Sequence, residues 1–410
     1  MDATTKDGYP GPGTARISRI RVRQFRSIHE TELSVGGVTA LVGEASAGKS
    51  NLRAAIALGL GGSRAEGNAS NSDAAISVDA ETSSGPVTLA YPVDAAESSI
   101  GGWPVAMLPS SLRDSTILDP AFAHKDHTGV TTLAAAFRQQ STRRTSPGAR
   151  AEAFVAAIEV CCEGAVSGVM LLIEEPEQFL RPQAQRYLYR LLHQFAAAGN
   201  QVVYSTHAPA FVNVARLDEV AVISRSPREG TLVHQAEPVP AGDEFRVMSE
   251  FDAERGELFL ADVAVLVEGR TEKLALPHVF RALGVDIDRQ GISIVECGGK
   301  SNLPVFVRLC QASGVPFLVL HDRDAEAPEE PIPSERRTNN TLRALAGDAR
   351  VFELAPDFEV VAGLRDRRHK PEQAWRHFQD LPASAVPAEL GRLVDAAVVL
   401  VANPATGPRR

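Results

Sequence analysis

Four acidic side chains stand close to the ends of two apolar runs in the second half of the sequence. The run in VLVEGRTEK leads into Glu268 and then Glu272, and the run in FLVLHDRDAE leads into Asp322 and Asp324. Short apolar runs bounded by turn residues indicate buried strands. Because ligands of parallel sheets bind where the carboxyl ends of the strands meet, we expect the four acids to lie together at that edge.

The chemistry that suits crowded carboxylates is the binding of a divalent cation. Like charges at one site repel, so the arrangement becomes favourable around a cation. All-oxygen ligands favour Mg²⁺ or Mn²⁺ over Zn²⁺. The alternative for Asp322 and Asp324 is a solvated turn at the end of a strand, and for FLVLHDRDAE taken alone that alternative is the better one.

The segment GEASAGKS (43–50) fits the pattern G-x-x-x-x-G-K-[ST] of a phosphate-binding loop. It follows a predicted strand and opens a predicted helix, which is the context that the pattern requires. Backbone N–H groups and the helix N-terminus would face the phosphates, Lys49 would reach the terminal phosphates, and Ser50 would hold Mg²⁺. A chance Gly-rich turn is the competing explanation. The residues predicted to bind ATP here are Gly43, Ala45, Gly48, Lys49, Ser50 and Asn51.

Paired glutamates end another apolar run, VMLLIEEPE (169–177). In P-loop enzymes such a strand carries one acid for the metal and often a second that orients the attacking water. Glu174 would be the metal-side acid and Glu175 would activate water. Glu177 is explained as well by an acid at a helix N-terminus. His207, in STH after the next strand, could sense the γ-phosphate, although a lone His at a strand end is usually structural.

The composition is that of an ordinary globular protein: 410 residues, of which 44% are hydrophobic and 23% charged. The net charge of −9 argues against a uniformly basic nucleic-acid binder, but an acidic enzyme can contact DNA through a basic face. Basic stretches at 143–150, 335–337 and 365–370 would supply that face or be solvated loops. The four cysteines form no C-x-x-C pair, which argues against a zinc knuckle or disulfide framework and favours a reducing cytoplasm. We expect neither a signal peptide nor a membrane span.

Strand and helix patterns alternate in both halves, which predicts two α/β domains with mainly parallel sheets. Residues 1–15 are polar and rich in Gly and Pro, so we expect a disordered tail there. A turn-rich, polar stretch at 226–256 predicts the domain boundary. The expected domains are therefore a nucleotide-binding domain at 16–245 and a second domain at 258–405.

Four segments of the first half together resemble the ABC-type ATPase heads of RecF, SMC and OLD (overcoming lysogenization defect) proteins: ISRIRVRQFRSI, GEASAGKSNL, LLIEEPEQFLRP and STHAP. The EEPE form is most similar to OLD nucleases. The resemblance implies an ABC/RecF-like P-loop domain and a signature loop that caps ATP bound by the opposite protomer of a homodimer. The candidate loop is TSPGAR, with Ser146 and Gly148, which departs from the usual L-S-x-G-G pattern.

In the second half, a strand-ending Glu-Gly followed later by Asp-x-Asp resembles the Toprim domain over about residues 260–375. That resemblance implies a Rossmann-like parallel sheet. ELAPDFE is similar to the acid-bearing segment of OLD proteins, which would make Glu359 a further metal ligand. RRHKPEQAW is similar to the segment with their functional lysine, here Lys370. Without the family context, Glu359 and Lys370 are explained equally well as surface residues.

The order of the two domains implies an OLD-like, ATP-dependent and metal-dependent DNA endonuclease, in phage defence or DNA repair. The expected cofactors are ATP with one Mg²⁺ ion, and two Mg²⁺ or Mn²⁺ ions at the Toprim site. The expected partners are DNA, a second copy bound through the ATPase heads, and a protein encoded in the same operon. The residues expected to act in catalysis are Glu175, His207, Glu268, Asp322 and Lys370. The expected metal ligands are Glu268, Glu272, Asp322, Asp324 and Glu359, with Ser50 and Glu174 for the ion on ATP.

Two other interpretations stay open. The chain could be an ATP-switched DNA-binding or repair scaffold whose Toprim-like half does not cleave. It could also be an ATPase subunit that acts on DNA only with a second protein.

Overall fold

The computed structural model describes the chain between residues 16 and 402 with internal gaps. The described residues are 16–60, 75–82, 85–91, 105–108, 121–123, 132–133, 135–136, 139–140, 146–164, 166–208, 211, 218–226, 228–235, 255–326, 330–331, 333–364 and 369–402. The chain divides into two compact units, residues 1–238 (the head unit) and residues 239–410 (the second unit). This division falls within the turn-rich stretch 226–256. In the part of the chain that is described, no helix is long and apolar enough to cross a membrane.

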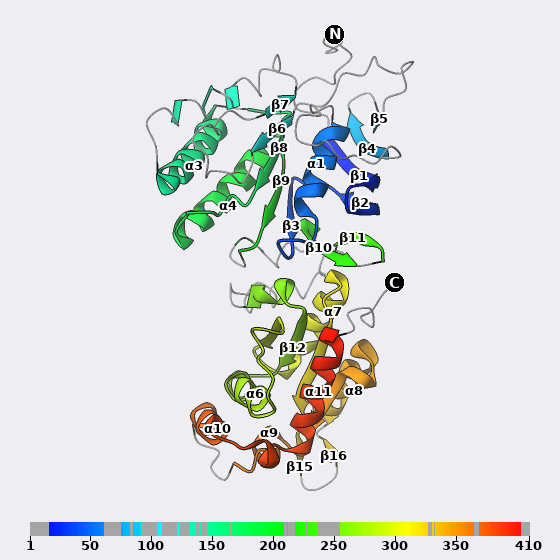
Figure 1. Ribbon diagram of the computed structural model, residues 1–410, viewed down its shortest axis with the longest axis vertical. Helices are drawn as coiled ribbons and strands as arrows, with labels where there is room; N and C mark the ends of the chain where they lie inside the picture. The colour runs from blue at the N-terminus through cyan, green and yellow to red at the C-terminus, as the bar shows by residue number, and fades with distance from the viewer. Residues whose placement is uncertain are drawn as a thin grey trace. The chain divides into compact units, whose positions relative to one another are not determined.

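The described strands of the head unit form one 11-stranded sheet in the order β5-β4-β1-β2-β11-β10-β3-β9-β8-β6-β7 (Figure 1). Its central strands β10, β3, β9, β8 and β6 pair in parallel, and the strands on either side pair antiparallel. The sheet is thus mixed, with the expected parallel arrangement at its centre. The strands are β1 (Arg16–Phe25), β2 (Ile28–Ser34), β3 (Val38–Val42), β4 (Ala75–Thr82), β5 (Gly85–Tyr91), β6 (Val105–Leu108), β7 (Ala121–Ala123), β8 (Met170–Glu174), β9 (Gln201–Thr206), β10 (Val220–Ser226) and β11 (Gly230–Gln235).

Burial explains why these head segments are strands and helices. β3 and β9 are buried at every position, as expected of central strands covered on both faces. The head helices are α1 (Lys49–Gly59), α3 (Pro147–Glu163) and α4 (Pro182–Ala197). Helix α4 buries Leu188, Leu191, Leu192 and Phe195, which share one helical face at spacings of three and four residues. Helix α1 packs its apolar side chains into a core cluster with β1, β4 and β9, and this fixes the loop that precedes it.

The second unit is built on a four-stranded, fully parallel sheet in the order β13-β12-β14-β17. The strands are β12 (Val263–Val267), β13 (Ile292–Glu296), β14 (Phe317–Asp322) and β17 (Val351–Leu354), with the short pair β15 (Ala325–Glu326) and β16 (Glu330–Pro331). The helices are α6 (Arg270–Ala282), α7 (Leu303–Ser313), α8 (Pro333–Ala346), α9 (Phe358–Val361), α10 (Lys370–Gln379) and α11 (Ala388–Ala402). Short 3₁₀ turns lie at Arg255–Leu260, Lys300–Asn302, Asp348–Arg350 and Ala383–Ala385.

The sheet of the second unit is covered by helices, so its strands are apolar at nearly every position. Side chains of α6, α10 and α11 pack with Val265 and Leu318 in one core cluster, and α7 contacts β12 and β14. The parallel order brings the carboxyl ends of β12, β13 and β14 to the same edge. The predicted parallel sheet is confirmed for this unit.

Candidate functional site

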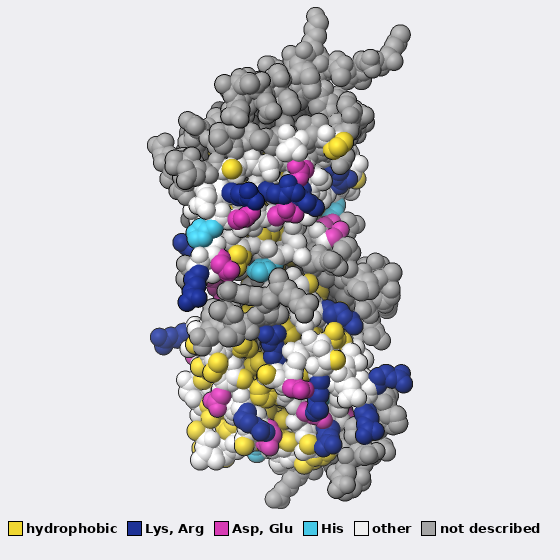
Figure 2. Space-filling view, turned by 90° about the vertical axis from the view of Figure 1, so that its right-hand side faces the viewer, with side chains coloured by type: hydrophobic (Ala, Val, Ile, Leu, Met, Phe, Trp, Pro, Cys, Tyr) yellow, Lys and Arg dark blue, Asp and Glu magenta, His cyan; other side chains and the backbone are white. Residues whose placement is uncertain are grey.

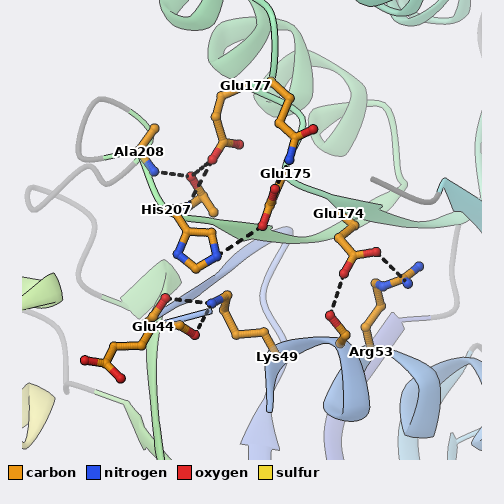
Figure 3. A network of polar contacts seen from close by, with 12 residues as sticks. Glu44, Lys49, Arg53, Glu174, Glu175, Glu177, His207 and Ala208 are labelled. Atoms are coloured by element: carbon orange, nitrogen blue, oxygen red, sulfur yellow. Dashed lines mark hydrogen bonds and ion pairs between the residues drawn. The ribbon is translucent and has the colours of Figure 1, made fainter. Parts of the chain in front are cut away.

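Lys49 lies near the end of the predicted phosphate-binding loop, as the first residue of α1. Its Nζ donates to the backbone oxygens of Gly43 and Glu44, both at 2.6 Å, and the side chain is buried (Figure 3). Burial lowers the pKa of Lys49 to about 8, against the opposing effect of the nearby carboxylates of Glu175 and Glu174. Burial disfavours the protonated form of Lys49, and an anion placed beside the ammonium group would stabilise that form again. The residue therefore suits a phosphate.

The predicted metal-side pair is in contact. Ser50 Oγ donates to Glu174 Oε1 at 2.5 Å, which joins the first turn of α1 to the end of β8. The other carboxylate oxygen of Glu174 accepts from Nη2 of Arg53 at 3.0 Å, and this pair is largely buried. Arg53 was not predicted from the sequence. The sequence feature that could have revealed it is a charged residue on the inward face of an otherwise apolar helix, because a buried charge needs a partner of opposite charge.

Glu175 and His207 also meet, as Figure 3 shows. His207 Nε2 lies 3.1 Å from Glu175 Oε1, and the other carboxylate oxygen of Glu175 accepts from the side-chain amide of Gln178. Glu175 has a φ of 47°, in the left-handed region that few non-glycine residues adopt. Strained backbone of this kind is concentrated at functional sites. The pKa of His207 is lowered, first by burial and then by the charge of Lys49, while Glu175 opposes the shift.

Glu177 does not stand at a helix N-terminus, because α4 begins only at Pro182. Its Oε1 instead accepts two bonds from the end of β9, from Thr206 Oγ1 at 2.7 Å and from the backbone N–H of His207 at 3.0 Å. Oε2 is buried and has no partner among the described residues. Burial raises the pKa of Glu177. Glu177 therefore ties the turn that carries Glu175 to the strand end that carries His207.

The glycines of the loop are required by the protein's own packing. A Cβ at Gly48, where φ is 109°, would lie 2.2 Å from Thr231 Oγ1, and a Cβ at Gly43 would lie 2.1 Å from the backbone oxygen of Ile223. Ala45 is exposed in the loop. Asn51 faces elsewhere: its amide donates to Ser27 Oγ at 2.7 Å and accepts from Arg26 at 3.2 Å.

Ser146 is the N-cap of α3, and its Oγ accepts from the backbone N–H of Ala149 at 3.3 Å. The side chain is exposed. Gly148 lies in the first turn of the same helix, and a Cβ there would meet nothing within 4 Å. The candidate signature loop therefore forms the N-terminus of α3, where Ser146 caps the helix and its side chain is exposed to solvent.

The second unit brings together the five acids Glu268, Glu272, Asp322, Asp324 and Glu359, here called the acid cluster. Glu268 follows β12, and its Oε1 accepts from the backbone N–H of Asp322 at the end of β14, at 2.7 Å. Asp322 Oδ1 accepts from the N–H of Phe358, the first residue of α9, at 2.8 Å. Glu272 folds back to accept from the N–H of Gly269 at 3.1 Å.

Burial and crowding raise the pKa values of three members of the acid cluster, Asp322, Glu268 and Glu272. The pKa of Asp322 rises to about 8, through burial first and then the charges of Glu268 and Asp324. The pKa values of Glu268 and Glu272 rise to about 7, again mainly through burial. Glu359 acts electrostatically on both Glu272 and Asp322. These carboxylates are stabilised as anions only when positive charge is placed among them.

Two lysines reach the acid cluster. Lys370 Nζ lies 2.9 Å from Oε1 of the buried Glu359, and this bond raises the pKa of Lys370. Lys300, which was not predicted, donates to the backbone oxygen of Asp322 at 2.6 Å and to Asp324 Oδ2 at 2.8 Å. The sequence feature that could have predicted Lys300 at this site is its position in CGGKSN, directly after a strand that ends at the same sheet edge.

The cluster's donor set fits a hard divalent cation, since it consists of carboxylates alone. In the described residues no group of three or more His, Cys, Asp or Glu side chains is already arranged to hold a metal ion. The hydrogen bonds account for this, because Glu268, Glu272 and Asp322 each direct a carboxylate oxygen to backbone N–H. A bound ion would have to replace some of these bonds and the contact of Lys300 with Asp324.

The predicted basic face is only partly within the described residues. Residues 143–145 and 365–368 lie outside them, and Arg336 and Arg337 are exposed on α8. Figure 2 shows basic and acidic side chains side by side on the head unit. On β1 and β2 these are salt bridges, among them Arg21 with Glu32 at 2.9 Å and Arg23 with Glu30 at 2.7 Å. That strand pair carries four arginines and two glutamates, so it remains basic although part of its positive charge is paired.

Comparison with known proteins agrees with both resemblances. Residues 259–324 match the family model described as overcoming lysogenization defect protein-like, TOPRIM domain. Residues 152–213 match the model described as AAA domain, putative AbiEii toxin, Type IV TA system. The chain is 33% identical over 246 residues to the OLD nuclease of Thermus scotoductus, an alignment that covers 55% of this chain and 47% of that protein. The chain thus spans about half the length of this curated relative.

Solved structures with detectable similarity include a region of an OLD protein and an SMC head domain. The C-terminal region of the Burkholderia pseudomallei OLD protein matches 35% of this chain and 99% of that one, with 17% identity and a TM-score of 0.30. The SMC head domain from Thermotoga maritima matches 54% of this chain and 99% of that one, with 15% identity and a TM-score of 0.34. The sequence matches therefore show that this chain is similar to OLD proteins and that it has an ATPase head followed by a Toprim domain.

Proposed function

We propose that the protein is an ATP-binding, metal-dependent DNA endonuclease in which the acid cluster cleaves the phosphodiester bond. The observation that carries this proposal is the convergence of five acids, with raised pKa values on three of them, at the carboxyl edge of a parallel sheet. The Thermus scotoductus relative is an OLD nuclease. Phage defence or DNA repair is the cellular setting we propose.

The reaction would be hydrolysis of the bond between phosphorus and O3′. The oxygen of water bonds to phosphorus, and O3′ leaves and takes up a proton. Two Mg²⁺ or Mn²⁺ ions held by the acid cluster would activate the water and stabilise the leaving oxygen. Lys370, held by Glu359 at 2.9 Å, would place a positive charge beside the phosphate as its negative charge grows.

The head unit would bind ATP at the loop 43–50 and use it to control or position the nuclease. Lys49 would contact the terminal phosphates, and Ser50 with Glu174 would hold one Mg²⁺ ion. Glu175 would orient the attacking water, with its carboxylate aligned by His207 and Gln178. Ser146 and Gly148 would reach ATP bound by a second copy, which makes a homodimer through the heads the proposed assembly.

The second candidate function is an ATP-switched DNA-binding scaffold. The observation in its favour is Lys300, which places a fixed positive charge on Asp324 within the acid cluster. In this case the second unit would bind DNA or a partner protein without cleaving.

A plasmid assay distinguishes the two functions. Supercoiled plasmid is incubated with Mg²⁺ or Mn²⁺, with and without ATP, using wild type, Asp322→Asn and Lys49→Ala. We expect wild type to nick, Asp322→Asn to be inactive, and Lys49→Ala to lose the response to ATP. Nicking by Asp322→Asn at the wild-type rate contradicts the nuclease. Tight DNA binding without nicking by wild type, measured by fluorescence anisotropy, supports the scaffold.

A further inference from the structure

Lys300 is a buried positive charge inside a group of acids, and the backbone fixes where it points. It follows β13 and the residues Gly298 and Gly299, whose φ values of 73° and 125° favour glycine. The N–H of Gly299 donates to the backbone oxygen of Glu268 at 2.7 Å, which anchors the turn to β12. The side chain of Asn302 donates to the backbone oxygen of Cys297 at 3.0 Å and closes the turn from the other side.

Two hydrogen bonds of Lys300 are with the segment that carries two of the five acids. Nζ donates to the backbone oxygen of Asp322 and to the carboxylate of Asp324, while the lysine itself is only 8% exposed. Asp324 has a φ of 53°, in the left-handed region that non-glycine residues seldom adopt, so its side chain projects from a strained turn. Its N–H donates to the backbone oxygen of Pro356 at 3.0 Å, which leaves the carboxylate directed to Lys300.

Lys300 therefore stands where a cation bound by Asp324 would stand. The charge of Lys300 also acts on Glu268, because it opposes the effect of burial on that carboxyl. A divalent ion placed between Glu268 and Asp324 would meet the ammonium group as a like charge. An ion held by Glu272, Asp322 and Glu359 would also meet an ammonium group, that of Lys370 on Glu359. The Lys370 side chain is 42% exposed and can turn to solvent, whereas that of Lys300 is 8% exposed and cannot leave without opening the turn.

We propose that Lys300 is a positioning residue that serves as a built-in cation at Asp324, so that the acid cluster takes up its two ions unequally. One divalent ion binds readily on the side of Glu272, Asp322 and Glu359. The second binds only when Asp324 exchanges Lys300 for the metal. This inference rests on the proposed metal-dependent function and deepens it, because it assigns the two ions different affinities.

The test is a titration of the full-length protein with Mn²⁺ alone, without nucleotide, followed by calorimetry and by the electron paramagnetic resonance signal of free Mn²⁺. The variants are Lys300→Met, which removes the charge, and Lys300→Arg, which keeps it. Arg289→Met removes an exposed positive charge of the same unit and is the matched control. Asp322→Asn identifies binding that belongs to the acid cluster.

We expect wild type, Lys300→Arg and Arg289→Met to bind one ion tightly and a second weakly. Lys300→Met should bind the second ion at least about tenfold more tightly, because the competing charge is gone. Equal affinities for the second ion in wild type and Lys300→Met, within about twofold, overturn the inference. If Asp322→Asn binds as much Mn²⁺ as wild type does, no Mn²⁺ binds at the acid cluster of wild type, and the metal-dependent function itself fails.

Asp324→Asn provides a second measurement that does not depend on the folding of Lys300→Met. Because Lys300 already occupies Asp324, this variant should remove the second ion while the first ion still binds, somewhat more weakly since the charge of Asp324 acts on Asp322. Loss of the first ion in Asp324→Asn shows that Asp324 binds it directly in the resting protein, and the inference is then wrong.

Discussion

The two units treat their carboxylates in opposite ways. In the head unit each acid has its own partner: Glu174 has Ser50 and Arg53, Glu175 has His207, and Glu177 has Thr206. In the second unit five acids share two lysines, and three of the five have pKa values near neutrality. The head acids are organised by the protein itself, whereas the acid cluster is left with a deficit of positive charge.

This difference indicates what each unit requires from outside. The head contributes a prearranged set of hydrogen bonds around the loop 43–50, so a nucleotide would meet groups already in place. The carboxylates of the acid cluster repel one another when they are ionised, and bound cations would reduce this repulsion. Under the proposed function, carboxylates would orient other groups in the head unit and bind ions in the second unit, and mutations should separate the two roles.

The largest expected effects come from removing one reactive group in each unit. Glu175→Gln should slow ATP hydrolysis by about 100-fold or more while ATP still binds, because the carboxylate proposed to orient water is gone. Lys370→Met should slow plasmid nicking by about 100-fold or more and leave ATP hydrolysis in the absence of DNA unchanged. Single-turnover assays of the two reactions measure both. If either variant stops both reactions, the two units do not have the separate chemistry argued above.

Glu177 tests whether the head is held together by its own hydrogen bonds. Glu177→Ala leaves Thr206 Oγ1 and the N–H of His207 without their buried acceptor, which should cost about 2–4 kcal/mol of unfolding free energy. Glu177→Gln keeps an acceptor oxygen and is the matched control. Chemical denaturation of both variants measures the difference. Equal stability of Glu177→Ala and Glu177→Gln would contradict the role of the acceptor.

The sequence predicted those parts of the molecule that depend on local pattern. Most of the parallel strands were recognisable because buried strands read as continuous apolar runs: those in VLVEGRTEK, FLVLHDRDAE and VMLLIEEPE form β12, β14 and β8. Strands such as β2 and β11 were not predicted. Neither is a continuous apolar run, since IHETELS is mostly polar and GTLVHQ has only two adjacent large apolar residues. Each forms a hairpin with the strand before it, β1 with β2 and β10 with β11, and the two hairpins pair through Gly230 and Ile28.

The acidic residues at the strand ends could be predicted from the sequence, but the side chains that pair with them could not. The pairing of Arg53 with Glu174 joins residues 121 positions apart, and that of Lys300 with Asp324 joins two loops. Such contacts depend on the order of strands in the sheet, which single-sequence patterns leave open. The direction in which Asn51 faces was equally hidden, because it is set by the turn between β1 and β2.

The pH dependence of stability should distinguish the second unit from the head. The folded pKa values of about 8 for Asp322 and about 7 for Glu268 and Glu272 exceed the ordinary values of 3.8 and 4.5. Between these limits the folded protein holds protons that the unfolded chain releases, so stability is highest at low pH and is lost as pH rises. In EDTA, the melting temperature of the second unit should therefore fall from about pH 5 to pH 8.

Divalent cations should reverse that trend, because they bind the deprotonated carboxylates. Melting curves with Mn²⁺ at the same pH values measure this, and Asp322→Asn should show a weaker dependence on both pH and Mn²⁺. A melting temperature that is independent of pH in EDTA would mean that the acids are not crowded in solution.

The smallest effect concerns whether the head needs a second copy of the chain. Ser146→Ala removes the N-cap of α3 and should lower stability by about 1 kcal/mol, whereas Ser146→Asp retains a capping oxygen and should be nearly neutral. If Ser146 also contacts ATP of the opposite protomer, Ser146→Asp should lose ATP hydrolysis despite its stability, because a carboxylate would face the phosphates. Wild-type hydrolysis should then rise more than linearly with protein concentration. If Ser146→Asp hydrolyses ATP normally, Ser146 is a helix cap alone, and the head site is complete within one chain.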